Sequence, residues 1–168
     1  MIDTTLEVKV GEWLRRRGLK LVTAESCTAG LIGHRLTNVS GSSDYYLGGL
    51  IAYANEAKER LLGVDHQAII QYGAVSQEVV IVMARGARQI LAGDFPPDRL
   101  IGLSVSGIAG PGGAMPGKPV GLTWIGLSAY GIERAWRYVW QGDRLDNKEQ
   151  SAEQALRLIL DFLQEDPL

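Results

Sequence analysis

A serine and its neighbours have the residue types that nucleophilic catalysis requires. Ser26 stands in the stretch TAESCTAG (23–30), where a predicted strand passes into a predicted helix. The first N–H groups of a helix lack intrahelical acceptors, so at such a turn they can stabilise an oxyanion beside a serine nucleophile. Serine is also a favoured N-cap residue, and Ser26 or Thr28 is expected to cap this helix. The local context alone favours that structural role over catalysis.

Lys58 is the candidate base, because a nucleophilic serine needs one. The stretch IAYANEAK places Tyr53 at the end of a predicted strand and Lys58 in the first turns of a helix. Burial and helix N-terminal potential both lower a lysine pKa. A pKa change from about 10.4 to about 7.5 requires about 4 kcal/mol of differential interaction. The alternative is an ordinary exposed helix lysine. His34, inside a predicted helix, and His66, in a polar connector, fit surface positions better than a catalytic one.

The residues beside Ser26 have both structural and functional interpretations. Glu25 could position Ser26 or cap the turn. Cys27 is the only cysteine in the chain, so it cannot form an internal disulfide. Its simplest interpretation is a small, buried, inert thiol. A single cysteine is typical of a protein in a reducing cytoplasm.

The stretch GPGGAMPGKPVG (110–121) nearly matches a phosphate-binding loop. Four residues separate Gly112 from Gly117, and Lys118 follows, but Pro119 stands where the pattern needs Ser or Thr. A phosphate-binding loop also leads into a helix, whereas the β pattern LTWIGLSAY follows here. The sequence therefore disfavours a nucleoside triphosphate site. Two alternatives remain: a long Gly/Pro turn, or a small anion nest of backbone N–H groups in SGIAGPGG.

Hydrophobic periodicity predicts the elements that position these residues. The pattern predicts helices within 4–17, 26–39, 55–63, 75–93 and 146–164, and a short helical connector over 64–73. It predicts strands over 19–25, 49–54, 99–107, 122–130 and 134–141, the last two as an antiparallel hairpin. Strands alternating with helices, plus one hairpin, predict an α/β protein: a three-layer α/β/α sandwich with a mixed, mostly parallel sheet.

Composition narrows the class of protein. The 168 residues, 46% hydrophobic and 21% charged, predict a single globular domain over 1–168. The net charge of −2 argues against a nucleic-acid partner. No apolar run reaches membrane-spanning length, and no signal-peptide pattern opens the chain, so we expect a cytoplasmic protein that does not bind membranes.

Several blocks, taken in order, resemble one known family. They are TAESCTAG, GSSDYYLGGLIAYANEAKERLLGV, YGAVSQEVVIVMARGA, SVSGIAGPGG, GKPVGLTWIGL and QGDR. They are similar to the blocks of the nicotinamide-nucleotide amidase (PncC) family, equivalent to the C-terminal domain of the competence/damage-inducible protein CinA. The resemblance covers roughly residues 6 to 163, and the matching order and spacing of several blocks make it specific.

The resemblance implies hydrolysis of nicotinamide mononucleotide to nicotinate mononucleotide and ammonia, within NAD salvage. It implies an α/β/α fold, no metal, no organic cofactor, and a homodimer or higher homo-oligomer. The family's serine, lysine and tyrosine correspond to the catalytic candidates Ser26, Lys58 and Tyr53. The expected substrate-binding residues are Glu25, Cys27, Thr28, Ala29, Gly30, Ser106, Gly107, Gly110 and Arg144, with Arg144 as the phosphate partner.

One departure and two alternatives accompany this interpretation. Ala29 stands where the family commonly has Gly, and its methyl group could alter the oxyanion donors. A non-catalytic nucleotide-binding module would need the same Gly loops and Arg144. An amidase acting on a different carboxamide would keep the catalytic residues and lose the need for a phosphate partner.

Overall fold

The computed structural model describes residues 5–165, and a five-stranded sheet forms its centre. The strands lie in the order β2-β1-β3-β4-β5. Their bounds are Lys20–Glu25 (β1), Tyr46–Ile51 (β2), Leu100–Gly107 (β3), Leu122–Ala129 (β4) and Ile132–Val139 (β5). β1 pairs in parallel with β2 and β3, whereas β4 pairs antiparallel with β3 and β5. The mixed sheet is confirmed. Most of its strands run in the same direction, but parallel and antiparallel strand pairs are equally frequent. The prediction "mostly parallel" therefore holds for the direction of the strands and not for their pairing.

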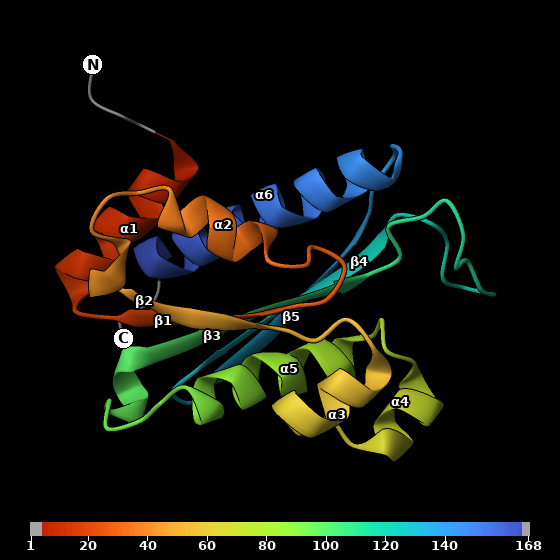
Figure 1. Cartoon of the computed structure of the whole chain (residues 1–168), viewed down its shortest axis with the longest axis horizontal. Coiled ribbons are helices and arrows are strands. Elements are labelled where there is room, and N and C mark those ends of the chain that lie inside the picture. The colour runs from red at the N-terminus through yellow and green to blue at the C-terminus, as the bar shows by residue number, and fades with distance from the viewer. Residues whose placement is uncertain (1–4, 166–168) are drawn as a thin grey trace.

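Helices cover both faces of this sheet, which confirms the three-layer α/β/α sandwich (Figure 1). One face carries α1 (Leu6–Arg17), α2 (Leu31–Thr37) and α6 (Arg144–Glu165). The opposite face carries α3 (Asn55–Leu62), α4 (His66–Tyr72) and α5 (Gln77–Ile90). Two short 3-10 helices, η1 (Ser42–Asp44) and η2 (Pro97–Arg99), complete the described elements. Within residues 5–165, no helix is both long enough and apolar enough to span a membrane.

Strand β1 shows how the sheet separates two apolar cores. Its side chains alternate, so Leu21 joins the core under α1, α2 and α6, while Val22 and Ala24 join the core under α5. All three side chains are fully buried. Complete burial of an aliphatic side chain contributes about 1.5–3 kcal/mol, so the middle of the sheet is a rigid support for the residues that follow its strands.

The helix predicted within 26–39 begins later than the capping prediction requires. Residues 26–30 form a turn, and α2 starts at Leu31 with Gly30 at its N-cap position. Neither Ser26 nor Thr28 caps this helix, so both capping predictions are wrong. The reason is that a carboxylate from the preceding strand satisfies the first N–H groups of α2.

The bounds of other elements also differ from the prediction. β2 lies three residues earlier than the predicted strand 49–54, because its Gly48-Gly49 pair weakens the β pattern. Glycine is needed there, since a Cβ on Gly49 would lie 2.2 Å from Thr23 Oγ1. β5 likewise begins two residues early, and α6 begins at Arg144 rather than at residue 146. The predicted helix 4–17 agrees with α1 from Leu6 onward, whereas Thr5 precedes the helix and residue 4 lies outside the described residues.

Candidate functional site

The candidate residues gather where β1, β2 and β3 end. Ser26 directly follows β1, Tyr53 follows β2, and Ser106 and Gly107 are the last residues of β3. The carboxyl ends of parallel strands form a common edge, which is the usual place for ligands in such sheets. A pocket of about 170 Å³ opens there, and its lining includes Ser26, Cys27, Tyr53, Asn55, Lys58, Ala74, Val75, Ser106, Gly107, Ala109 and Arg144.

Lys58 is buried against Ser26. Only 2% of its surface is exposed, so the alternative of an ordinary exposed lysine is wrong. Its Nζ donates hydrogen bonds of 3.0 Å each to Ser26 Oγ, to the Ala52 carbonyl and to the Tyr53 carbonyl. Burial lowers the pKa of the Lys58 amine below its usual value, because desolvation penalises the charged form.

The three partners of Lys58 suit an amine that loses a proton. An ammonium group has three N–H donors, and here a hydroxyl and two carbonyls accept them. After one proton leaves, two N–H groups still serve the Ala52 and Tyr53 carbonyls, and the lone pair faces the Ser26 hydroxyl. The same geometry therefore accommodates the neutral amine that can accept the proton of Ser26.

The turn after β1 leaves two backbone donors available beside Ser26. In this turn, Ala29 N–H bonds the Ser26 carbonyl at 3.0 Å and Gly30 N–H bonds Glu25 Oε2 at 3.0 Å, so neither is available to an oxyanion. Within residues 5–165, the N–H groups of Cys27 and Thr28 have no acceptor in another residue. Of these two residues only Cys27 lines the Ser26 pocket, so the Cys27 N–H is the remaining candidate for holding an oxyanion.

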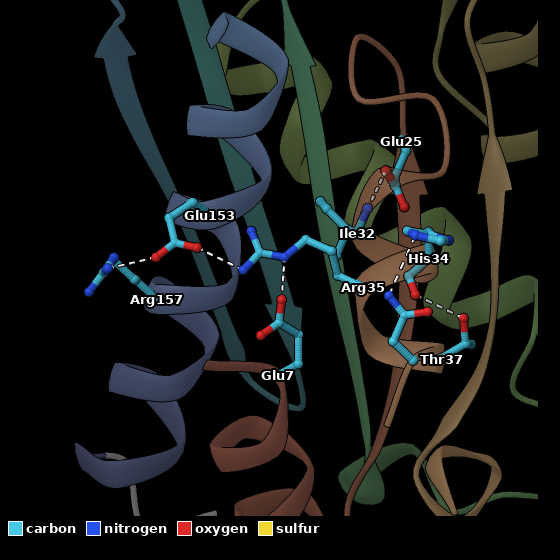
Figure 2. Close-up of polar contacts among 9 residues, drawn as sticks. Glu7, Glu25, Ile32, His34, Arg35, Thr37, Glu153 and Arg157 are labelled. Carbon is cyan, nitrogen blue, oxygen red and sulfur yellow. Dashed lines mark hydrogen bonds and ion pairs between the residues drawn. The ribbon is translucent and has the colours of Figure 1, made fainter. Parts of the chain in front are cut away.

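Glu25 caps α2 in place of a serine or threonine. Its Oε2 accepts from the N–H group of Ile32 at 3.1 Å (Figure 2). Oε2 also accepts from the N–H group of Gly30 at 3.0 Å, and Oε1 accepts from that of Gly33 at 2.9 Å. The residue is 2% exposed. The structure therefore places the carboxylate of this expected substrate-binding residue in the helix cap, where both oxygens are already engaged.

Cys27 lies next to the nucleophile candidate as a neutral thiol. It is 5% exposed, and burial raises the pKa of its thiol to about 12. A thiol with so high a pKa is a poor nucleophile at neutral pH. This agrees with the interpretation of Cys27 as a buried, inert side chain.

Thr28, Ala29 and Gly30 face a second hollow rather than the Ser26 pocket. They line a cavity of about 330 Å³ together with Leu31, His34, Leu145, Lys148 and Glu149. Ala29 has a φ of 48°, in the left-handed region that favours glycine. The resemblance implies Gly at this position, and the backbone conformation of Ala29 is one that favours Gly.

Tyr53 and Arg144 meet at the rim of the pocket. Arg144 Nη2 donates to the Tyr53 hydroxyl at 2.8 Å, and Arg144 Nη1 donates to the Gly110 carbonyl at 2.7 Å. The Tyr53 phenol is thus bonded to Arg144, and only the Tyr53 carbonyl contacts Lys58. Arg144 also borders an adjoining apolar hollow of about 480 Å³, so its guanidinium stands between two cavities.

Ser106 and Gly107 form the side of the pocket contributed by β3. Ser106 is 1% exposed, and its Oγ donates to the Ala74 carbonyl at 2.9 Å. A Cβ on Gly107 would lie 2.7 Å from Thr123 Oγ1 and 3.0 Å from Cys27 Sγ. Glycine at 107 therefore lets β3 approach the turn that carries Ser26.

The loop at 110–121 is not a triphosphate-binding loop. It leads into strand β4 and not into a helix. Lys118 Nζ donates to the carbonyls of Tyr72 at 2.5 Å and Val75 at 2.9 Å. Lys118, the lysine that would bind a phosphate, is therefore hydrogen-bonded to backbone carbonyls. This agrees with the prediction, made from Pro119, that the loop is not a nucleoside triphosphate site.

Four residues of the pocket lining were not predicted from the sequence: Asn55, Ala74, Val75 and Ala109. Asn55 could have been predicted as a pocket residue, because it lies between Tyr53 and Lys58 in the same sequence block. Ala74 and Val75 carry no chemical signal, because they come from the segment between α4 and α5 and their side chains are small and apolar.

An ion-pair network fixes the helices that bear the turn and Arg144. Arg35 in α2 bonds Glu7 in α1 through Nε, and its Nη2 bonds Glu153 in α6 at 2.7 Å (Figure 2). Arg157 also bonds Glu153, at 2.6 Å. One guanidinium therefore links all three helices on this face of the sheet.

Comparison with known proteins identifies the family. The family model described as the CinA C-terminal domain matches residues 3–163. A CinA-like protein from Salinibacter ruber is 50% identical over 154 residues, which cover 92% of this chain. A putative competence-damage inducible protein from Moorella thermoacetica is 47% identical over 157 residues, which cover 94%. The chain spans 36% of the length of each of these two relatives.

Solved structures have the same fold over nearly the same length. A competence-damaged protein (CinA) superfamily protein from Klebsiella pneumoniae superposes with a TM-score of 0.88 at 29% identity, covering 96% of this chain and 97% of that one. A competence or damage-inducible protein from Enterobacter asburiae gives a TM-score of 0.87 at 32% identity, with 94% and 96% covered. This chain therefore belongs to the CinA C-terminal domain family.

Proposed function

We propose that this chain is an amidase that hydrolyses nicotinamide mononucleotide to nicotinate mononucleotide and ammonia. The observation that carries the proposal is the buried Lys58 amine, 3.0 Å from Ser26 Oγ and hydrogen-bonded otherwise to two carbonyls. A serine beside a lysine of lowered pKa is a nucleophile with its base in place.

In the first half-reaction, neutral Lys58 accepts the hydroxyl proton of Ser26 while Oγ attacks the carboxamide carbon. The N–H group of Cys27 supports the oxyanion that develops, contributing about 3 kcal/mol. The carbon–nitrogen bond then breaks, Lys58 returns the proton to the leaving nitrogen, and ammonia departs. Ser26 is left as an ester of the nicotinate group.

In the second half-reaction, water cleaves this ester. Neutral Lys58 takes a proton from the water as its oxygen attacks the acyl carbon, and the proton returns to Ser26 Oγ when the ester bond breaks. The products are the free serine and the carboxylic acid, which releases its proton to the solvent and becomes the carboxylate, so water is the only co-reactant.

The resemblance to the amidase family supports the nucleotide substrate, and Arg144 supports its phosphate. The guanidinium uses one N–H of each terminal nitrogen on Tyr53 and Gly110, so further donors remain for phosphate oxygens. The pocket of about 170 Å³ holds the carboxamide end, and the hollow shared with Arg144 extends it toward the phosphate.

The test is ammonia release from nicotinamide mononucleotide by the purified protein. Ser26→Ala should abolish release while keeping the melting temperature, because only the attacking oxygen is lost. Ser43→Ala, at an exposed serine, is the matched control and should keep wild-type activity. Near-normal turnover by Ser26→Ala would exclude Ser26 as the nucleophile.

The substrate is tested in the same assay with the riboside that lacks the 5′-phosphate. If Arg144 holds the phosphate, Arg144→Met should raise the KM for the nucleotide and leave the KM for the riboside unchanged. Wild-type protein that binds the nucleotide and releases no ammonia would instead indicate a nucleotide-binding module.

A further inference from the structure

Residues 72–75, which run from the last residue of α4 into the connection to α5, are held by side chains through all four of their carbonyls. Lys118 Nζ donates to the first and last, Tyr72 and Val75, at 2.5 and 2.9 Å. Ser76 Oγ donates to the Gly73 carbonyl at 2.8 Å. The Ala74 carbonyl accepts from Ser106 Oγ at 2.9 Å. Residues 72–75 are therefore fixed by donors from three different parts of the chain.

This segment, residues 72–75, is one wall of the Ser26 pocket. Ala74 and Val75 line that pocket, and Ser106, which holds Ala74, lines it as well. Backbone carbonyls in such a connection have no ladder or helix partner, so their position depends on these side-chain donors. A displaced segment would carry the pocket wall and the Ser106 hydroxyl contact with it.

The loop at 110–121, which nearly matches a phosphate-binding loop, positions Lys118 next to this segment. Met115 and Lys118 exchange N–H···O bonds of 2.9 and 2.8 Å, which close a tight turn at the tip of the loop. Gly73 has a φ of 81°, and a Cβ there would lie 2.3 Å from Lys118 Nζ. Glycine at 73 thus permits the close approach of the ammonium group.

We infer that Lys118 is a positioning residue for the Ser26 site: its ammonium locks residues 72–75 into the wall of the catalytic pocket. The inference rests on the proposed amidase function. Lys118 has no contact with the reacting atoms in this account. It acts through Ala74 and Val75, and through Ser106, which binds the same segment.

The experiment compares Lys118→Met with Lys20→Met. Methionine keeps the length of the side chain and removes its donors. Lys20 is the matched control, because its Nζ also donates to a backbone carbonyl, that of Asp44, at the opposite end of β1. Each variant is measured by peptide-resolved hydrogen exchange across 70–80 and by steady-state ammonia release.

Lys118→Met should raise exchange across 70–80 by about tenfold or more and lower kcat by about tenfold to a hundredfold, since small misplacements of a site have effects of that size. Lys20→Met should change neither quantity. Ser106→Ala acts through the same segment, so the double variant Lys118→Met/Ser106→Ala should lose less activity than the product of the single losses. Multiplicative losses would indicate two unrelated effects and contradict the inference.

Other outcomes separate this inference from the proposed function. Exchange across 70–80 that matches wild type in Lys118→Met overturns the inference, and so does faster exchange with unchanged kcat. A wild-type protein with no amidase activity refutes the proposed function instead. In that case the exchange data alone decide whether Lys118 locks the segment.

Discussion

The Lys58 amine is buried with a hydroxyl and two carbonyls as its hydrogen-bond partners, and among residues 5–165 no carboxylate accepts from it. An ion pair would hold a lysine in its charged form. Here burial is the leading influence on its pKa and acts in the opposite direction. The side chain is therefore placed to exchange a proton with Ser26.

Replacement of Ala29 by glycine is predicted to stabilise the protein. A left-handed conformation costs a non-glycine residue about 1–2 kcal/mol, while glycine loses more backbone entropy on folding. Ala29→Gly should therefore raise the free energy of unfolding, by about 0.5–1 kcal/mol, in urea denaturation. Gly30→Ala is the opposite control, because Gly30 has a φ of 95° and a Cβ there would lie 3.2 Å from Ile51 Cδ1. A destabilised Ala29→Gly would mean that the methyl group contributes packing that outweighs the strain.

At the scale of elements, α2 depends on Glu25 for its N-terminus. Glu25→Ala leaves three N–H groups without their acceptor, so the free energy of unfolding should fall by about 1–3 kcal/mol. Glu25→Gln keeps one carbonyl oxygen and should lose less. Chemical denaturation of the two variants measures the difference. Equal stability of Glu25→Ala and wild type would show that α2 does not need the carboxylate.

The elements were largely predictable from the sequence, and their ends were not. Long apolar periodicity identified α5 and α6, and alternation around the turn at 131 identified the β4–β5 hairpin. The start of α2 was missed because its cap comes from the preceding strand, and the pattern of serine and threonine suggested the usual local cap. The predicted position of β2 was wrong because Gly48 and Gly49 weaken its strand pattern; of the two, Gly49 is required by the close approach to Thr23.

At the scale of the whole molecule, the fold joins segments that are distant in sequence. The edge where β1, β2 and β3 end brings Ser26 to Lys58, which is 32 residues away, and Tyr53 to Arg144, which is 91 residues away. The resemblance named these four residues, whereas local patterns alone left Lys58 an exposed lysine and Ser26 a cap. No pattern in the sequence indicated that the Tyr53 phenol would pair with Arg144, or that residues 72–75 would supply a wall.

The pH dependence of kcat/KM for ammonia release from nicotinamide mononucleotide tests the central claim most directly. The base is the neutral amine, whose fraction rises as pH increases through the Lys58 pKa. Because burial lowers that pKa below 10.5, wild-type activity should rise with pH along a limb displaced from 10.5 toward neutrality. Lys58→Ala, folded as judged by its melting transition, should have almost no activity at any pH. A Lys58→Ala protein that retained turnover with the same rising limb would contradict the account.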